Sequence, residues 1–166
     1  MRRTVRTLAA MLAVTVPAQT ALAQAEAMPK FYVYGETDDA VGLTECKVSH
    51  ASGILAVQAE LKAKGITIQY DSKDPEAVMD TYLNLTAMTI PGRKGECTYN
   101  FELAFESFNE VGNPFTGAKE FTKLTYCSKG SLMVWDTKTA QATMNDKLRE
   151  YVGECLSRYQ GRNSRK

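Results

Sequence analysis

Residues Cys97 to Phe105 read C-T-Y-N-F-E-L-A-F, with apolar and mostly polar side chains in alternation. A period of two predicts a β-strand that turns one face to the core and the other to solvent. A turn sequence at 91–95 precedes this strand, and a loop rich in Gly and Asn is expected at about 110–119 after it. We therefore expect an antiparallel sheet with this strand at its centre.

Two other regions carry helical spacing. Apolar residues recur at steps of three and four along residues 43–64 and again along 140–159. This spacing predicts two long helices, the first followed by Gly65 and the second ended by Gly161.

Shorter segments complete the predicted sheet. Strands are expected at 30–36, 66–70, 82–90, 121–126 and 132–135, with a turn at 128–130. Asp74-Pro75-Glu76 is a helix-start pattern, so that residues 77–88 are open to either a helix or a strand. The order of elements predicts an α+β domain, in which a mainly antiparallel sheet of four to six strands has two long helices packed on one face.

The composition is that of one ordinary globular domain. The chain has 166 residues, of which 44% are hydrophobic and 23% charged, with a formal net charge of +1. A chain of this length buries about 70% of the surface that its unfolded form exposes, which is enough for a core without cross-links or metals. The small charge argues against a nucleic-acid binder and against a basic protein of the membrane surface.

The N-terminus has the three-part pattern of a secretory signal. Three arginines precede an apolar stretch of about ten residues, too short for stable membrane insertion, and small residues up to Ala23 and Ala25 fit a cleavage site. We expect residues 1–25 to be removed, 26–160 to form the single domain and 161–166 to be a basic, frayed tail. Loss of the three arginines takes the net charge from +1 to −2. The expected location is periplasmic or secreted.

Four cysteines lie in the expected mature chain: Cys46, Cys97, Cys127 and Cys155. An even count behind an export signal predicts two structural disulfides. The absence of a C-x-x-C pattern argues against a thioredoxin-type redox site and a paired-thiolate zinc site. Pairing 46–97 with 127–155 and pairing 46–155 with 97–127 both fit the expected elements. Each bond closes a loop of about 28 residues or more, for which chain entropy gives roughly 3 to 4 kcal/mol.

His50 is the only histidine, so that any mechanism with a histidine base or ligand depends on it. It shares the expected helix face with Cys46, Ile54 and Val57, which favours a histidine at the edge of the core, hydrogen-bonded to a neighbour. No G-x-S-x-G pattern supplies a nucleophile for it. We therefore expect a protein that is not an enzyme.

Metal and cofactor patterns are missing from the sequence as well. It contains no phosphate-binding glycine pattern, and its densest acidic group lacks the spacing of a calcium loop. That group is Asp71, Asp74, Glu76 and Asp80. Glu102 and Glu106 lie on the polar face of one strand, where glutamates ordinarily point into solvent. We expect no metal, no cofactor and no catalytic residue.

Aromatic side chains are concentrated in residues 99–135, and most of them are expected in the core. Phe108 and Phe115 are exceptions because they flank the segment rich in Gly and Asn. Aromatic side chains exposed on a loop mark binding surfaces. We therefore expect the segment from Phe108 to Phe121 to be the recognition element, with Phe108, Asn113, Phe115 and Phe121 as its binding residues.

These observations favour an exported module that binds another envelope or secreted protein, such as an inhibitor, an immunity factor or an accessory protein of an envelope complex. The first alternative is a carrier that holds a small apolar ligand between the helices and the sheet. The second is a small secreted hydrolase that uses His50. An internal cavity would favour the carrier, and a polar cleft with a nucleophile beside His50 would favour the enzyme. A solid core with exposed loop aromatics would favour protein recognition.

Overall fold

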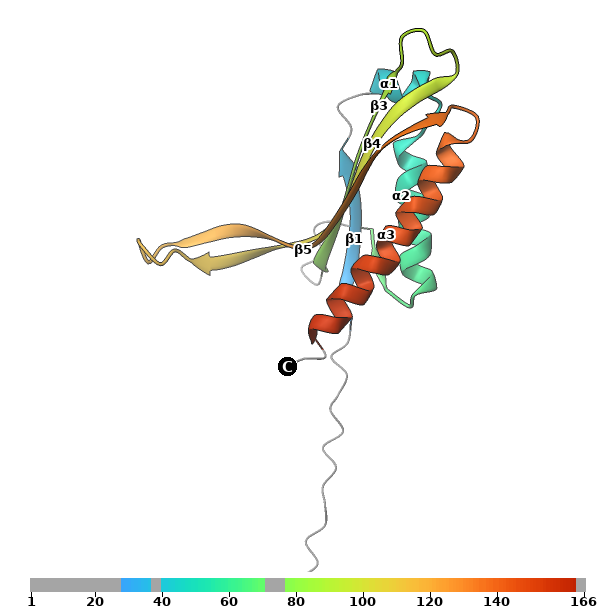
Figure 1. Cartoon of the computed structure of the whole chain (residues 1–166). Helices are drawn as coiled ribbons and strands as arrows, with labels where there is room; N and C mark the ends of the chain where they lie inside the picture. Colours follow the sequence, from blue (N-terminus) through green and yellow to red (C-terminus); the bar gives the residue numbers. More distant parts are fainter. Residues whose placement is uncertain (1–27, 37–39, 71–76, 164–166) are drawn as a thin grey trace, which may run out of the picture.

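Five strands form one sheet in the order β2-β1-β3-β4-β5, and the two long helices, α2 and α3, lie on one side of it (Figure 1). The computed structural model describes residues 28–36, 40–70 and 77–163. The strands are β1 (Lys30–Glu36), β2 (Ile68–Gln69), β3 (Ala77–Thr89), β4 (Glu96–Gly112) and β5 (Lys119–Asp136), and the helices are α1 (Ala40–Glu45), α2 (His50–Ala63) and α3 (Ala140–Asn163). The predicted α+β class is confirmed.

The sheet has a parallel half and an antiparallel half. β1 pairs in parallel with both β2 and β3, because α1 and α2 carry the chain back across the sheet between them. β3, β4 and β5 are consecutive antiparallel neighbours, and the predicted turn at 91–95 joins the first two. The strand predicted at 97–105 is the middle of β4, next to the longest partner in the sheet.

The core lies between the sheet and the two long helices. Alternate side chains of β4 point into it, from Tyr99 to Phe105, and none of them retains exposed surface. Met144 and Leu148 of α3 and Val57 and Leu61 of α2 meet them with none of their surface exposed either. The strand period of β4 and the helical period of α2 and α3 therefore mark the residues that face each other in this core.

The first predicted helix, at 43–64, is wrong in one respect, because the chain forms two helices there. α1 ends at Glu45, and Lys47 has a φ of 56°, which breaks the helical path. Ser49 then caps α2, accepting a hydrogen bond from the Ser52 amide. The predicted end is correct, since α2 stops at Ala63 and Gly65 has a φ of 78°.

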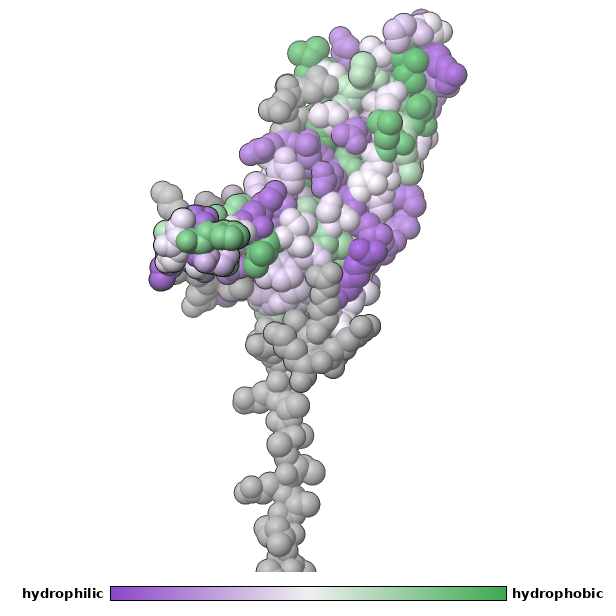
Figure 2. Space-filling model, turned by 60° about the vertical axis from the view of Figure 1, so that its left-hand side comes forward, coloured by the Kyte–Doolittle hydropathy of each residue, from purple (hydrophilic) through white to green (hydrophobic). Residues whose placement is uncertain are grey.

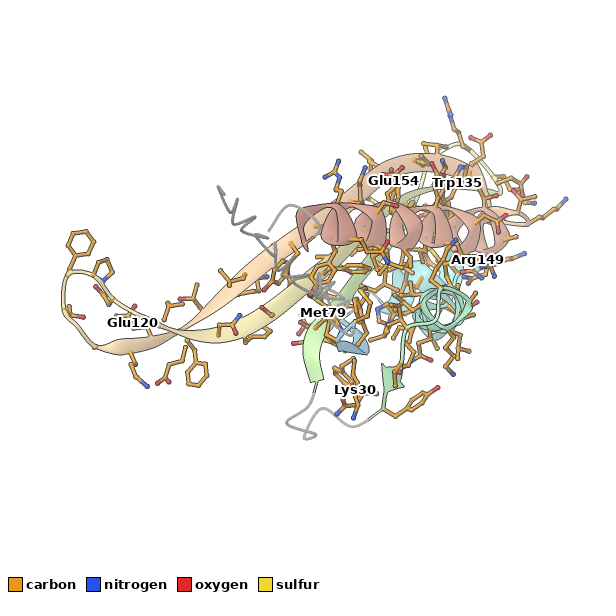
Figure 3. The ribbon with its side chains drawn as sticks, turned by 90° about the horizontal axis from the view of Figure 1, so that it is seen from below. Lys30, Met79, Glu120, Trp135, Arg149 and Glu154 are labelled. Carbon is orange, nitrogen blue, oxygen red and sulfur yellow. A yellow bond between two sulfur atoms is a disulfide. The ribbon has the colours of Figure 1, made fainter. Side chains whose placement is uncertain are left out.

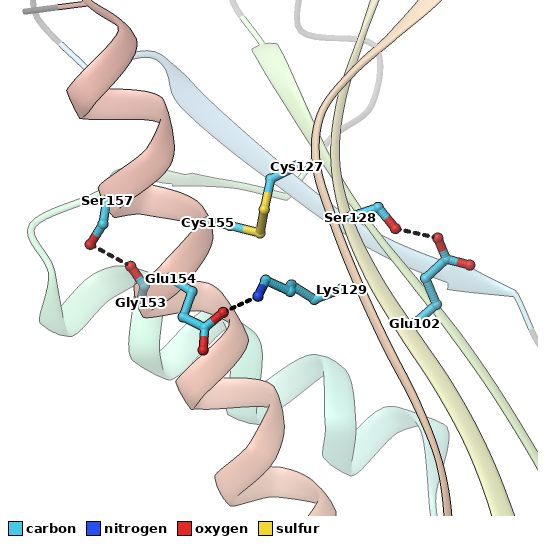
Figure 4. Close-up of a disulfide and its surroundings, with 8 residues drawn as sticks. All are labelled: Glu102, Cys127, Ser128, Lys129, Gly153, Glu154, Cys155 and Ser157. Carbon is cyan, nitrogen blue, oxygen red and sulfur yellow. Dashed lines mark hydrogen bonds and ion pairs between the residues drawn. A yellow bond between two sulfur atoms is a disulfide. The ribbon is translucent and has the colours of Figure 1, made fainter.

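The turn predicted at 128–130 is also wrong, because β5 continues through it. Gly130 pairs with Glu102 of β4, and a Cβ at Gly130 would lie 3.3 Å from the Phe101 carbonyl oxygen, so the glycine permits a close strand approach. Figure 4 shows Ser128 and Lys129 on opposite sides of the strand, Ser128 bonded to Glu102 and Lys129 paired with Glu154 of α3. Adjacent residues on opposite faces are typical of a strand.

Three further expectations concern element ends. Residues 77–88, which were open to either a helix or a strand, form a strand. The Asp74-Pro75-Glu76 pattern and the expected signal at 1–25 lie outside the described residues. The loop expected at 110–119 is shorter, because β4 runs to Gly112 and β5 starts at Lys119. α3 passes Gly161 and ends at Asn163, since Gly161 does not adopt the positive φ of a helix-ending glycine.

The disulfides are Cys46–Cys97 and Cys127–Cys155, the first of the two expected pairings. Cys46–Cys97 joins the end of α1 to the start of β4. Cys127–Cys155 joins β5 to α3 (Figure 4). All four cysteines are buried, and each bond links the helical layer to the sheet.

Candidate functional site

β4 and β5 extend past the rest of the sheet as a two-stranded hairpin, which we call the arm (residues 107–124). β3 pairs with β4 only as far as Asp80 opposite Glu106, so that within the described residues the arm has no third strand. The β4–β5 register shifts between Phe105 and Glu106, and a bulge at such a place bends a hairpin. Figure 1 shows the arm projecting away from the sheet and the helices.

Asn113 organises the tip of the arm. Its side-chain oxygen accepts hydrogen bonds from the amides of Phe115 (2.8 Å) and Thr116 (3.2 Å), and its side-chain nitrogen donates to Glu120 (2.7 Å). Gly117 has a φ of 70°, a conformation that glycine adopts readily. Asn113 therefore has a structural role in the free protein, because it fixes the turn that presents Phe115.

The three predicted phenylalanines are exposed. The exposed fraction is 95% for Phe115 at the tip, 82% for Phe121 and 52% for Phe108. Val111 and Leu124 add further exposed apolar surface to the arm. Figure 2 looks along the arm and shows apolar residues at its surface among polar ones. Large aromatic side chains on a projecting element are typical of a binding surface.

Phe108 and Phe121 lie on the same side of the arm. Phe108 is opposite Lys123 and Phe121 is opposite Glu110, so the two rings are diagonal neighbours across the hairpin. By the alternation of β4, this side continues into the face of the sheet that carries Glu106 and points away from α2 and α3. We call that face, with Tyr34, Tyr82, Asn100 and Glu106, the open face.

Sequence analysis missed a hollow where the arm meets the open face. This root hollow has a volume of about 230 Å³ and is lined by Tyr34, Glu36, Tyr82, Glu106, Phe108 and Lys123. Its residues come from four strands, and the parallel pairing of β1 with β3 that unites them has no sequence signature. Glu106 also corrects an expectation, because only 3% of it is exposed although it was expected to point into solvent.

Glu106 is the central charge of the root hollow. Its carboxylate lies 3.0 Å from the Lys123 ammonium, which raises the pKa of Lys123 through a hydrogen bond and opposite charge. Burial, together with the charge of Glu106, raises the pKa of Asp80, which faces Glu106 across the two strands. Burial and the nearby carboxylates of Glu106, Asp80 and Glu36 raise the pKa of Tyr34 to about 12. The hollow thus brings two carboxylates, one of them paired with Lys123, close to two phenol rings.

His50 lies at the edge of the core, as expected. Its Nε2 is 3.1 Å from the Leu83 carbonyl oxygen, which can only accept, so this nitrogen carries a proton and donates. The hydroxyl of Ser49 accepts from the Ser52 amide, and that of Ser52 accepts from Asn145. Neither nearby serine makes a described hydrogen bond to the histidine, and this arrangement offers no support for the hydrolase alternative.

The carrier alternative requires space between the helices and the sheet. The facing side chains there, among them Phe31, Leu83 and Phe101, have no surface that a water-sized sphere can touch. One hollow of about 570 Å³ lies at the surface beside the 91–95 turn and not between the helices and the sheet. The carrier alternative has no supporting observation in the described core.

None of the helices placed in the structure is both long and apolar enough to cross a membrane. No group of three or more His, Cys, Asp or Glu side chains within residues 28–36, 40–70 and 77–163 is arranged to hold a metal ion.

Three lipoproteins of known structure resemble this chain distantly. No family model matches the chain, and no curated protein sequence does. Rare lipoprotein B from Shewanella oneidensis aligns over 81% of this chain and 97% of its own, at 12% identity and a TM-score of 0.29. A lipoprotein from Caulobacter crescentus (77% and 84% covered, 11% identity, TM-score 0.26) and a minor lipoprotein from Acinetobacter baumannii (81% and 91%, 11%, 0.25) align in a similar way. Likenesses at these scores carry no argument about function.

Proposed function

We propose that this chain is an exported, non-enzymatic module that binds another envelope or secreted protein through the arm. The observation that carries the proposal is the arm itself, a two-stranded hairpin with exposed phenylalanines near its root, along its length and at its tip. An inhibitor, an immunity factor and an accessory protein of an envelope complex are the roles that fit such a module.

The energetics favour a partner for the arm. A hairpin without a third strand or a packed helix is marginally stable. The arm therefore adds little to the stability of the rest of the domain, which we call the body. Each phenylalanine that a partner buries fully contributes about 1.5 to 3 kcal/mol. Aromatic anchors of this size, held on a short turn such as the one that Asn113 fixes, are the residues that dominate binding energies at interfaces.

The proposed location is periplasmic or secreted. The signal-like pattern at 1–25 supports export, and the two buried disulfides fit an oxidising compartment. Because both disulfides join the helical layer to the sheet, their formation after export is part of producing the folded body that presents the arm.

Site-specific photo-crosslinking tests the proposal. The oxidised mature chain carries p-benzoylphenylalanine either at Phe115 or at Leu55 of α2, which is 65% exposed and serves as the matched control. After irradiation in an envelope extract of the producing organism, we expect one defined protein adduct from position 115 and none from position 55. In a binding assay with that partner, Phe115→Ala should weaken binding at least tenfold while the thermal midpoint stays unchanged.

Two results would contradict the proposal. The same adducts from both positions would show that the arm is no more reactive than any exposed apolar residue. A Phe115→Ala protein that loses stability and keeps its partner would make Phe115 a structural residue.

A further inference from the structure

The root hollow combines three features that a cationic side chain needs. Tyr34 and Tyr82 line it with their rings 5.4 Å apart, and the Tyr82 hydroxyl is 3.5 Å from a Glu36 carboxylate oxygen. Aromatic faces and carboxylates together attract a positive group more strongly than either does alone, because the ring quadrupole adds to the full charge. The volume, about 230 Å³, suits a side-chain head group rather than a folded element.

The charges of the hollow are unbalanced. Glu36 and Glu106 line it, and Asp80 stands directly opposite Glu106 on the neighbouring strand, a placement of like charges that destabilises a sheet. Lys123 is the one basic residue among its described lining residues. Burial raises the pKa of Asp80, and the negative charge of Glu106 raises it further. A second cation would relieve this repulsion.

Glu106 already binds one cationic group, the ammonium of Lys123. This ammonium sits 3.0 Å from the buried Glu106 carboxylate, while about half of the lysine side chain remains exposed. Because the carboxylate is buried, loss of the lysine would leave an uncompensated charge, so a second cation binds beside Lys123 and does not replace it. Glu36, the second carboxylate of the hollow, is exposed and accepts a hydrogen bond from the Tyr82 hydroxyl.

The position of the hollow links it to the arm. Phe108 lines the hollow and lies on the same side of the arm as Phe121, so that a partner covering these rings also covers the hollow. Figure 3 shows the arm, marked by Glu120, continuing directly from the sheet, whose far end is marked by Trp135.

We propose that the root hollow binds an arginine side chain of the partner protein, an inference that rests on the arm's proposed role in protein binding. The guanidinium is planar, stacks on tyrosine rings and offers several N–H donors to carboxylates, whereas an ammonium is a point charge that Lys123 already supplies. The arginine packs against the Tyr34–Tyr82 ring pair and donates to Glu36 and Glu106. The net charge of the hollow is thereby reduced where the partner seals it from water.

Titration with a small probe tests this inference without the partner. The oxidised mature protein is titrated with an arginine blocked at both ends, and the ring resonances of Tyr34 and Tyr82 are followed by NMR. Blocked citrulline, which has the same shape without the charge, and blocked lysine are the matched ligands. We expect saturable shifts of both rings with arginine, at least threefold weaker binding of lysine and no saturation with citrulline.

Matched variants locate the binding carboxylate. Glu36→Gln should weaken arginine binding about threefold, the size of effect that one exposed ion pair contributes. Glu150→Gln, the same change on an exposed glutamate of α3, should leave binding unchanged. Because Glu36 is exposed and outside the core, this variant is expected to fold normally.

Each result bears on one of the two proposals. Equal shifts with arginine and citrulline, or no effect of Glu36→Gln, would overturn the arginine site, and equal affinity for lysine would overturn the choice of a guanidinium. Arginine binding in a protein whose position 115 captures no partner would leave the hollow supported and the arm's role refuted. Capture at position 115 without arginine binding would support the arm's role and refute the arginine site.

Discussion

Gly35 and His50 show how the absence of one side chain positions another. The His50 ring lies against β1 at Gly35, and a Cβ on this glycine would be 2.3 Å from two ring atoms and 2.5 Å from the Leu83 carbonyl oxygen. That same carbonyl accepts the hydrogen bond from His50. No side chain fits at position 35 unless the ring or the backbone of β3 moves.

Gly35→Ala should therefore lower the free energy of unfolding by about 1 to 3 kcal/mol, the usual range for an overpacked site. Gly153→Ala on α3 is the control, because its Cβ would meet nothing within 4 Å. Alanine is the better helix former, so this variant should be up to about 1 kcal/mol more stable than the unmodified protein. Urea unfolding followed by circular dichroism measures both. Equal stability of Gly35→Ala and the unmodified protein would show that His50 does not occupy this place.

Sequence alone predicted single residues well where the local pattern decided their environment. Phe108 and Phe115 were expected outside the core because Gly and Asn surround them, and both are exposed. Glu106 was misjudged because its burial comes from β3 and β5 beside it, together with Lys123. A strand pattern states which side a residue faces and not how much of that side its neighbours cover.

Among the elements, the two disulfides hold different parts of the helical layer to the sheet. Cys46–Cys97 spans 51 residues and anchors the end of α1, and Cys127–Cys155 spans 28 residues and anchors α3 to β5 close to the arm. Loop-closure entropy rises only slowly with loop length, so that the two bonds should differ little in their effect on stability.

Replacing both cysteines of either bond by alanine should lower the free energy of unfolding by about 3 to 4 kcal/mol. The local effects should differ. Without Cys127–Cys155, amide hydrogen exchange should rise at Tyr126 and Cys127, whereas loss of Cys46–Cys97 should leave these two amides protected. Identical exchange at these amides in the two double variants would show that the second bond does not hold the root of the arm.

The elements were predictable where one periodicity continued without interruption. The centre of β4 and most of α3 follow this rule. The break between α1 and α2 was not predicted, because the helical spacing of Cys46 and His50 continues through it. Ser49, which caps α2, was the one local signal of a new helix. Ser128-Lys129-Gly130 resembles a turn locally, yet the long partner strand β4 keeps it extended.

At the scale of the whole molecule, the body holds the residues that stabilise the fold, and the arm holds those proposed to bind the partner. The body contains the core, both disulfides and the packed helices, whereas the arm beyond Phe108 has no buried residue among those described. Since β3 stops pairing at Glu106, little of the body's packing depends on the strands farther out. Removal of the outer arm should therefore separate binding from folding.

Residues 110–121 can be replaced by Asn-Gly, which joins Asn109 to Thr122, two residues that face each other across the hairpin. Asn-Gly favours the tight turn that matches the twist of a hairpin. The shortened protein retains Phe108 and Lys123, and its free energy of unfolding should change by less than about 1 kcal/mol, the usual limit for surface changes. It should also bind the blocked arginine with unchanged affinity, because the root hollow is kept.

The same protein should lose its ability to compete for the partner. In the crosslinking assay at position 115, an excess of the shortened protein should leave the yield of adduct unchanged, while an equal excess of Leu55→Ala protein should reduce it in proportion to its concentration. Phe115 and Phe121 are absent from the first competitor and intact in the second, so the comparison isolates the outer arm. Equal competition by both proteins would place the recognition surface on the body and not on the arm.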